Sequence, residues 1–248
     1  MLNEYTIGIT TFSKRLNFAT NLIKQIRQYV DNKIILIVNG EKDGNFDEEY
    51  RQNILNVCLQ HANIFPVFYI ETRGLSKMWN TAVIVSDTDN VLILNDDIEI
   101  HTRDIFDSVT NIIRLENYTG IMRMNGSFSH FVVNKSIIHK LGYFDERLLG
   151  FGEEDGDIVY RMLQINSDVG NINVNGLVNI VSGIRHDFIK PGVGKYSNFN
   201  RQFIYGEKYK SNNSSPYKGM FDTPMELLIE NKNQYPYEKF FKDNKGKL

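Results

Sequence analysis

The sequence predicts an α/β protein built on an open, mostly parallel sheet. In its N-terminal half, short apolar and β-branched segments alternate with segments whose apolar residues recur at helical spacing. One of the apolar segments, Lys33 to Val38, has no polar interruption after its first residue, which is typical of a strand buried on both faces of a parallel sheet. The 248 residues, 42% of them hydrophobic, suffice for one large domain.

The elements of the N-terminal half follow from these patterns in chain order. Phe18, Leu22, Ile23 and Ile26 recur at helical spacing, as expected for the first helix. The second predicted strand stops at Asn39-Gly40, and the fourth ends abruptly at Asn95-Asp96-Asp97. Strands are expected at 5–10, 33–38, 65–70 and 90–94, and helices at 17–29, 50–61 and 76–85.

The second half is less regular. Helices are expected at 104–115, 136–141 and 157–165, strands at 120–124 and 128–133, and a strand pair within 171–181. The segment 189–216 is rich in Gly, Asn, Ser, Tyr and Lys and is too long for an ordinary connection. It is either a lid that brings Lys195, Tyr196 and Arg201 over a ligand or a flexible surface excursion. A last helix is expected at 225–231, before a lysine-rich tail.

Composition excludes several functional classes. The net charge of −2 gives no basic footprint for nucleic acid. The only cysteine, Cys58, excludes an internal disulfide and suits a reducing compartment. The N-terminus lacks the pattern of a signal peptide, and no apolar run approaches the roughly 20 residues of a membrane span. We therefore expect a cytoplasmic protein, and the basic, aromatic segment 235–242 leaves peripheral association with the inner face of the membrane open.

Polar residues gather where the predicted strands end, at 10–13, 39–40, 71–74 and 95–97. Ligands of open α/β sheets bind outside these carboxyl ends. The four ends supply hydroxyls, an aromatic ring, an amide, one arginine and two acids, a set that suits a nucleotide diphosphate with a divalent cation. Neither a GxGxxG nor a GxxxxGK[ST] motif is present. The phosphate charge would therefore be balanced by a metal, by Arg73, or by both.

A second acidic feature lies at 150–157, where four carboxylates occupy five positions: Glu153, Glu154, Asp155 and Asp157. One interpretation is a helix N-terminus, where acidic residues are favoured by the helix dipole. The other is an active site, because crowded carboxylates hold protons tightly and can serve as a general base. Arg161 stands one helical turn after Asp157 and is expected to pair with it.

These motifs together resemble nucleotide-sugar-dependent glycosyltransferases of the GT-A fold, similar to the large family 2. The C-terminal half also resembles the catalytic region of β-1,4-galactosyltransferases. Asn95-Asp96-Asp97 resembles the DxD motif, Phe144-Asp145-Glu146 with 150–157 and Arg161 resembles the acceptor-side motif, and Ile184-Arg185-His186 resembles the segment that supplies a late metal-binding histidine. The resemblance covers Tyr5 to Asp187.

The resemblance implies one GT-A domain at 1–188, with a single mostly parallel mixed sheet flanked by helices. Residues 1–103 would form the nucleotide-binding half and 104–188 the acceptor and catalytic half, and 189–248 would be a flexible loop or lid with a C-terminal extension.

The resemblance also implies roles for single residues. Asp97 and His186 would ligate Mn²⁺ or Mg²⁺, and oxygens plus one imidazole suit Mn²⁺ somewhat better. Asp155 would be the catalytic base, and Glu154 would hold an acceptor hydroxyl. The donor nucleotide would be bound by six residues, with Phe12 stacking on the base and Asp96 near the ribose or sugar: Thr10, Phe12, Asn39, Arg73, Asn95 and Asp96.

The implied function is inverting, metal-dependent transfer of a sugar from a nucleotide sugar, expected to be a UDP-hexose, to a hydroxyl of a glycan or glycolipid acceptor in the assembly of a surface glycan. Asn95 replaces the first acid of DxD, and Asn39 stands where family 2 often has an aspartate. The first departure keeps open a catalytically weak or inactive protein that binds a glycan or nucleotide. A sugar nucleotidyltransferase would need a GxGTR-like loop, which 9–15 lacks.

Plainer interpretations of single residues stay open beside these roles. Asp97 could be a turn residue, His186 a surface ion-pair partner, Arg73 a surface residue and Phe12 part of the core. Trp79 is expected in the core or at the acceptor, and His101 is expected to be structural.

Overall fold

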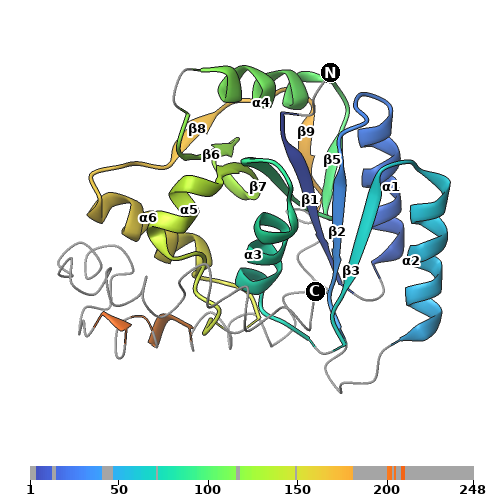
Figure 1. Ribbon diagram of the computed structural model, residues 1–248, viewed down its shortest axis with the longest axis horizontal. Coiled ribbons are helices and arrows are strands. Elements are labelled where there is room, and N and C mark those ends of the chain that lie inside the picture. Colours follow the sequence, from blue (N-terminus) through green and yellow to red (C-terminus); the bar gives the residue numbers. More distant parts are fainter. Residues whose placement is uncertain are drawn as a thin grey trace.

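A seven-stranded mixed sheet forms the centre of the computed structural model (Figure 1). The structure describes residues 4–12, 15–40, 47–70, 72–115, 118–148, 150–180, 200–202, 204 and 208–209. The strand order across the sheet is β3-β2-β1-β4-β7-β6-β8. This arrangement, flanked by helices, confirms the predicted α/β class and mixed, mostly parallel sheet.

The four strands of the N-terminal half pair in parallel, with β1 between β2 and β4. All residues of β1 and β2 are buried, as expected for strands covered on both faces. The bounds of all four strands agree with the predicted segments to within two residues: β1 (Thr6–Thr11), β2 (Ile34–Val38), β3 (Ile64–Phe68) and β4 (Asn90–Asn95). Parallel pairing brings the four carboxyl ends to one edge of the sheet.

The remaining strands extend the sheet beyond β4. Strand β7 (Ser127–Asn134) runs antiparallel to β4, β6 (Ile121–Met124) runs antiparallel to β7, and β8 (Gly170–Ile172) runs parallel to β6. A separate two-stranded ribbon is formed by β5 (Ile98–Ile100), which the sequence analysis missed, and β9 (Leu177–Asn179).

The predicted strand pair within 171–181 is wrong. Its two strands exist as β8 and β9, but each pairs with a different partner, β6 and β5. The reason lies in the connection between them. The Asn125 side chain donates to the Val174 carbonyl at 3.0 Å and accepts from the Val174 amide at 2.8 Å. The Asn125 side chain therefore satisfies backbone groups of Val174, between the two strands, that a hairpin would have paired across them.

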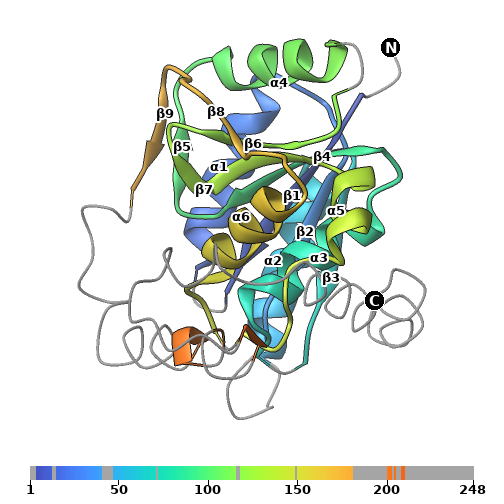
Figure 2. The ribbon, with the colours of Figure 1, turned by 90° about the vertical axis from the view of Figure 1, so that its left-hand side faces the viewer.

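Helices cover both faces of the sheet. The apolar sides of α1 (Leu16–Arg27), α2 (Glu48–Gln60) and α4 (Asp104–Arg114) pack into one core with the β5–β9 ribbon. On the other face, turned toward the viewer in Figure 2, lie α3 (Leu75–Val85), α5 (Lys135–Leu141) and α6 (Glu154–Gln164). Among the described helices, none is long and apolar enough to cross a membrane.

Local chemistry sets several helix ends. Asp47 caps α2 by accepting from the Tyr50 amide at 2.9 Å, and Asn134 caps α5 by accepting from the Ser136 amide. Helix α5 ends at Gly142, whose φ of 80° is the left-handed conformation that favours glycine. Trp79 of α3 is buried against Phe131 and Phe144, so its predicted place in the core is confirmed.

Part of the segment predicted as a loop or lid is packed against the domain. Ile204 and Tyr209 are buried in a small apolar cluster with Leu148 and Tyr160. Most of 189–216 lies outside the described residues, including Lys195 and Tyr196, as do the predicted helix at 225–231 and the tail at 235–242. The lid and the division at 188/189 therefore stay predictions.

Candidate functional site

The carboxyl ends of β1 and β4 lie side by side because Thr10 pairs with Asn95 in the sheet. The Thr10 hydroxyl donates to Asn95 Oδ1 at 3.0 Å, and the Trp79 indole N–H donates to the same oxygen at 3.4 Å. Two predicted donor-binding residues, Thr10 and Asn95, are thus brought together. Their contacts with each other and with Trp79 fix which end of the Asn95 amide faces the sheet.

Asp96 is buried and turned toward the end of β1. Its carboxylate accepts from the Thr11 hydroxyl at 2.7 Å and from Arg15 Nη1 at 2.5 Å. Burial raises the pKa of this carboxyl to about 7, although the Arg15 guanidinium and the Thr11 hydroxyl both favour its charged form. Asp96 therefore lies beside the predicted donor site, and both of its oxygens already bind protein groups.

Asp97 follows at the turn after β4, with its side chain 16% exposed. Its Oδ2 lies 3.6 Å from Arg15 Nη2, whereas its buried Oδ1 has no hydrogen-bond partner in the described part of the chain. An unpaired carboxylate oxygen at a strand end suits a hard divalent cation. Asp97 thus fits the predicted metal-ligand role.

The second predicted ligand, His186, lies outside the described residues. The amide of Ile180, six positions earlier, donates to the Asp97 carbonyl at 2.9 Å, so the chain leaves the described part beside Asp97. Within that part, no group of three or more His, Cys, Asp or Glu residues could hold a metal ion.

Arg15 is a site residue that the sequence analysis missed. It is buried at the N-cap of α1 and faces both members of the acidic pair, and its guanidinium stacks 5.2 Å from the Phe18 ring centroid. The sequence does show an arginine four residues after β1. Its contacts with Asp96 and Asp97, however, depend on β1 and β4 being neighbours in the sheet. Sequence order alone separates these strands by two others.

The ends of β2 and β3 are tied together by Asn39. Its side chain accepts from the Arg73 amide at 2.7 Å and donates to the Arg73 carbonyl at 2.9 Å. The Arg73 guanidinium lies 6.0 Å from the Tyr69 ring centroid. Phe12 is half-buried at the end of β1 and packs against the core, with its carbonyl bound by the Tyr50 hydroxyl at 2.7 Å. Asn39 thus positions Arg73, and the predicted nucleotide contacts of Arg73 and Phe12 stay predictions.

The acidic segment opens α6, three residues earlier than predicted. Glu154, Asp155 and Asp157 all lie in the first helical turn, where their charges favour the helix dipole. The chain enters the helix through two left-handed residues, Gly152 with φ of 111° and Glu153 with φ of 77°. The helix dipole thus explains why the carboxylates lie at the start of α6. Their separate contacts show which of them are paired with other protein groups.

Three of the four carboxylates have different environments. Glu153 pairs with Arg201, Oε1 to Nη2 at 2.7 Å. Glu154 is buried, accepts from the Gly152 amide at 2.6 Å through Oε2, and has no partner for Oε1 in the described part of the chain. Burial raises its pKa to about 8. Asp155 is exposed and accepts from the Gly156 amide at 2.9 Å, and no ion pair from a described residue reaches it.

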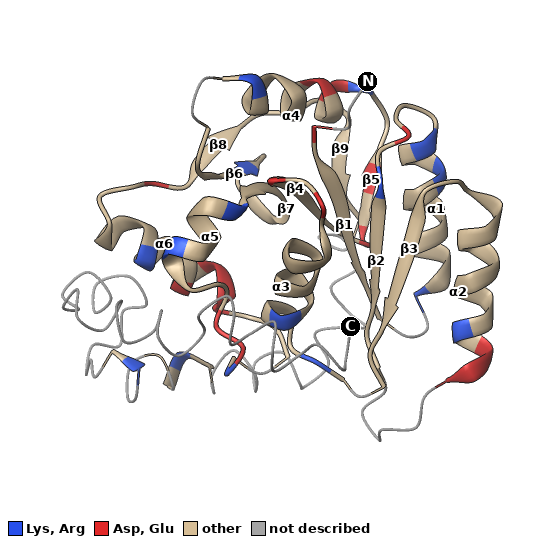
Figure 3. Cartoon of the chain, viewed as in Figure 1, with Lys and Arg blue, Asp and Glu red and all other residues tan. Residues whose placement is uncertain are grey.

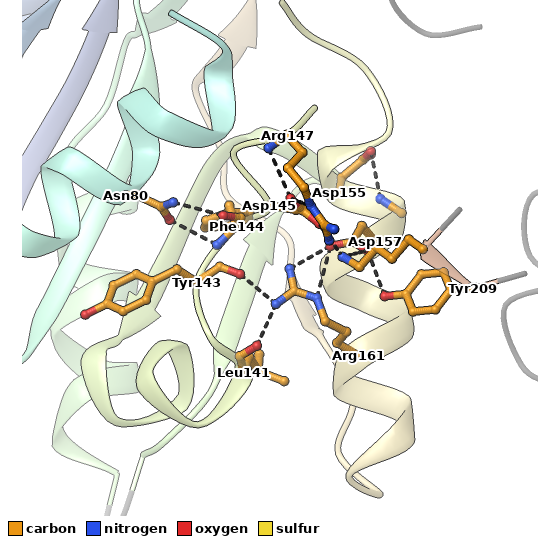
Figure 4. Close-up of polar contacts among 12 residues, drawn as sticks. Asn80, Leu141, Tyr143, Phe144, Asp145, Arg147, Asp155, Asp157, Arg161 and Tyr209 are labelled. Carbon is orange, nitrogen blue, oxygen red and sulfur yellow. Dashed lines mark hydrogen bonds and ion pairs between the residues drawn. The ribbon is translucent and has the colours of Figure 1, made fainter. Parts of the chain in front are cut away.

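Asp157 is fully buried and braced by Arg161, which confirms the predicted pair. Arg161 donates through Nε and Nη2 to Asp157 Oδ2 at 3.0 and 2.7 Å, and its Nη1 donates to the carbonyls of Leu141 and Tyr143 (Figure 4). Burial opposes the charge on Asp157, but Arg161 and Lys208 outweigh it and lower the pKa. The arginine therefore joins α6 to the end of α5.

Lys208 and Tyr209 complete this buried network and were not predicted. Lys208 Nζ lies 2.7 Å from Asp145 Oδ2 and 2.5 Å from Asp157 Oδ1, and the Tyr209 hydroxyl donates to Asp157 Oδ1 at 2.8 Å. Arg147 binds Asp145 from the other side at 2.6 Å. No sequence signal marks Lys208, because it is one lysine of a long polar segment.

The acidic segment approaches the strand ends through the start of α3. The Leu75 amide donates to the Gly150 carbonyl at 2.7 Å. A Cβ on Gly74 would lie 2.7 Å from the Leu148 carbonyl oxygen, so only glycine permits this approach. In Figure 3 the acidic start of α6 lies on the same lower side of the molecule as the carboxyl ends of β1, β2 and β3. Donor-side and acceptor-side residues thus share one side of the protein.

The mixed sheet flanked by helices matches the GT-A fold of solved structures. The solved structures that resemble it include a mannosyltransferase and a glucosyl-3-phosphoglycerate synthase. The mannosyltransferase PcManGT from Pyrobaculum calidifontis, in complex with GDP-Man and Mn²⁺, has a TM-score of 0.61 at 12% identity, covering 94% of this chain and 73% of that one.

Two further solved structures share the fold. Glucosyl-3-phosphoglycerate synthase from Mycobacterium tuberculosis, in complex with Mn²⁺, UDP and glucosyl-3-phosphoglycerate, has a TM-score of 0.59 at 10% identity, covering 86% of this chain and 82% of that one. Residues 1–349 of S. aureus TarS give 0.57 at 10% identity, with 96% and 74% covered. No protein-family model and no curated protein matches the sequence. At these identities the likeness shows the fold.

Proposed function

We propose that this protein is a metal-dependent, inverting glycosyltransferase that moves a sugar from a nucleoside-diphosphate donor to a hydroxyl of a glycan or glycolipid. One observation carries the proposal. On one side of the fold, Asp97 after β4 has an Oδ1 with no hydrogen-bond partner among the described residues, while Asp96 beside it is paired with Arg15. On the same side, Asp155 at the start of α6 is exposed, while Glu153 and Asp157 are paired. A transferase of this kind needs one carboxylate for a cation and one for a proton.

The donor would lie over the carboxyl ends of the parallel strands. Phe12 would stack on the base, and Thr10 and Asn95 would lie beside the donor, where the ends of β1 and β4 pair. Asn39 fixes the backbone of Arg73, whose guanidinium would neutralise diphosphate charge. UDP is the expected nucleotide, although GDP-Man in the mannosyltransferase shows that the fold accommodates a purine donor.

Asp97 fits a divalent cation through its unpaired Oδ1, and His186 would be the second protein ligand. Two of the structural relatives bind Mn²⁺. A bound Mn²⁺ or Mg²⁺ would supply positive charge against the diphosphate as it leaves. Arg15 neutralises Asp96, so the acidic pair offers one net negative charge to a cation.

Asp155 would take the proton of the acceptor hydroxyl. The hydroxyl oxygen then forms a bond to the anomeric carbon from the face opposite the diphosphate, and the bond from that carbon to the diphosphate oxygen breaks. One displacement inverts the configuration. Glu154, held by the Gly152 amide and protonated near neutral pH, could donate from Oε1 to an acceptor oxygen. This modifies the role expected from the sequence by making Glu154 the hydrogen-bond donor.

The decisive experiment is a screen of UDP-, GDP- and TDP-sugars for release of nucleoside diphosphate in the presence of Mn²⁺. We expect slow hydrolysis of at least one donor, lost on chelation. Asp97→Ala should lower the Mn²⁺ affinity and the hydrolysis rate by roughly 10–100-fold or more, since even outer contacts of a metal site have effects of that size. Asp89→Ala, an exposed aspartate before the other end of β4, is the matched control.

The screen also distinguishes the glycosyltransferase from a second candidate function. A non-catalytic protein that binds a glycan or nucleotide is favoured by Asn95, which replaces an acid and whose amide oxygen is occupied by Thr10 and Trp79. That function predicts saturable donor binding by calorimetry without turnover of any donor. Hydrolysis that is equally fast in Asp97→Ala would contradict the metal role.

A further inference from the structure

Five described residues of the C-terminal part of the chain pack against α6 and the two residues before it: Asn200, Arg201, Ile204, Lys208 and Tyr209. We call them the C-terminal clasp. Asn200 Nδ2 donates to the Gly152 carbonyl at 2.8 Å, and Arg201 pairs with Glu153 at 2.7 Å. The first contacts of the clasp therefore fall on the two residues that lead into the helix.

Of these two residues, Glu153 has a backbone conformation that needs external support. Glu153 is in the left-handed region, which costs free energy for any residue with a Cβ, and its side chain does not cap the helix. Such a conformation persists where surrounding contacts determine it. Asn200 and Arg201 supply contacts of that kind to Gly152 and Glu153.

Lys208 joins two separate parts of the acceptor half. Its Nζ binds Asp145, in the loop after α5, and Asp157, in the first turn of α6. Both carboxylates already have an arginine partner, Arg147 and Arg161. The cluster is thus electrically balanced without the lysine, so Lys208 adds a geometric link between loop and helix.

Tyr209 reinforces this link. Its hydroxyl donates to the same Asp157 oxygen that Lys208 binds, and its ring packs edge-on against Tyr160 with centroids 4.6 Å apart. Asp155 precedes Asp157 by two residues, and two residues of an α-helix span about 200° around its axis. Fixing Asp157 inward therefore orients Asp155 outward, where it is exposed.

We propose that the C-terminal clasp is a positioning device for the transfer reaction: through Lys208 it holds the start of α6 in the orientation that presents Asp155 to the acceptor. The inference rests on the proposed function. A misplacement of about 1 Å can lower a rate by about 10²-fold. The clasp should therefore act on kcat and leave donor binding unchanged.

The test uses the full chain with Lys208→Met, which keeps an unbranched side chain as far as the lysine Cε, removes only the ammonium group, and leaves two aspartates balanced by two arginines. We expect kcat for sugar transfer to fall by about 10–100-fold with the donor KM unchanged, since the donor site lies at the strand ends. Lys208→Arg, which can also reach two carboxylates, should restore most of kcat. Lys33→Met removes a lysine from an exposed ion pair with Asp87 and is the matched control.

A second measurement does not depend on activity. Hydrogen exchange of the amides of 152–157 should become faster in Lys208→Met and, to a smaller extent, in Tyr209→Phe, while the strands of the sheet keep their protection. Unchanged exchange and unchanged kcat in Lys208→Met would overturn the proposal. So would a uniform loss of protection over the whole chain, because the lysine would then serve general stability. If wild-type protein transfers no sugar, the proposed function fails, and the exchange result still decides whether the clasp orders the start of α6.

Discussion

The two acidic clusters of this protein differ in which parts of the chain pair with their carboxylates. At the end of β4, Asp96 and Asp97 face Arg15, which comes from the neighbouring strand's connection to α1. At the start of α6, Glu153 and Asp157 are bound by Arg201, Arg161 and Lys208, two of which come from beyond the described sheet. The first cluster is formed by two strands that are neighbours in the sheet, and the second is completed by residues of the C-terminal part of the chain.

The difference teaches how a protein can present one reactive carboxylate within a crowded acidic segment. Burying and pairing the neighbours removes most of their mutual repulsion and fixes the backbone. The remaining carboxylate, Asp97 in one cluster and Asp155 in the other, keeps an oxygen for a ligand. The sheet fixes the first cluster rigidly, whereas the second depends on contacts from the C-terminal part of the chain.

The largest expected effect is the loss of sugar transfer when Asp155 is replaced. Asp155→Asn keeps the shape and the contact with the Gly156 amide but cannot accept a proton, so transfer should fall by about 10²–10⁴-fold while donor affinity stays near the wild-type value. Product formation and calorimetric donor binding measure the two quantities. Asp168→Asn is the control, because Asp168 is also exposed and also accepts from the next amide. Near-normal transfer by Asp155→Asn would rule out the base.

The next effect tests the cluster at β4. Arg15→Gln leaves the buried Asp96 without its cation, and breaking a buried ion pair costs about 3–5 kcal/mol in the free energy of unfolding. Arg103, which likewise stands at a helix N-cap, forms an exposed pair with Asp107, so Arg103→Gln should cost less than about 1 kcal/mol. Urea unfolding measures both. Equal costs would show that the buried pair is not what organises the end of β4.

The last test is a pH dependence at the start of α6. Burial raises the pKa of Glu154 from 4.5 to about 8, so the folded protein binds this proton more tightly than the unfolded chain does. Its contribution to stability is therefore complete below about pH 4.5 and is lost as the pH rises to 8, by at most about 1.4 kcal/mol per pH unit. Glu154→Gln, which does not titrate, should lack this decline. Parallel stability curves of the two proteins between pH 5 and 8 would contradict a protonated Glu154.

Much of the fold could be predicted because it depends on local patterns. The continuous apolar segment at β2 indicates a strand, and the helical spacing of Leu22, Ile23 and Ile26 indicates a helix. Neither pattern depends on which other element packs or pairs with it. The wrong predictions concern a short strand that was missed and the pairing of two strands. Strand β5 is three residues long, too short for a periodic signal, and the strands β8 and β9 separate because Asn125 occupies the backbone groups between them.

The candidate site divides in the same way. The sequence by itself determined which residues carry chemistry, namely the acids after β4 and at the start of α6, and the Asp157–Arg161 pair, because these contacts lie within one turn or one strand end. Only the tertiary structure decided which carboxylates are occupied. Arg15 reaches Asp96 across 81 positions and Lys208 reaches Asp157 across 51, and no local pattern encodes such pairs. Charge pairing between distant segments depends on where the folded sheet and helices place them.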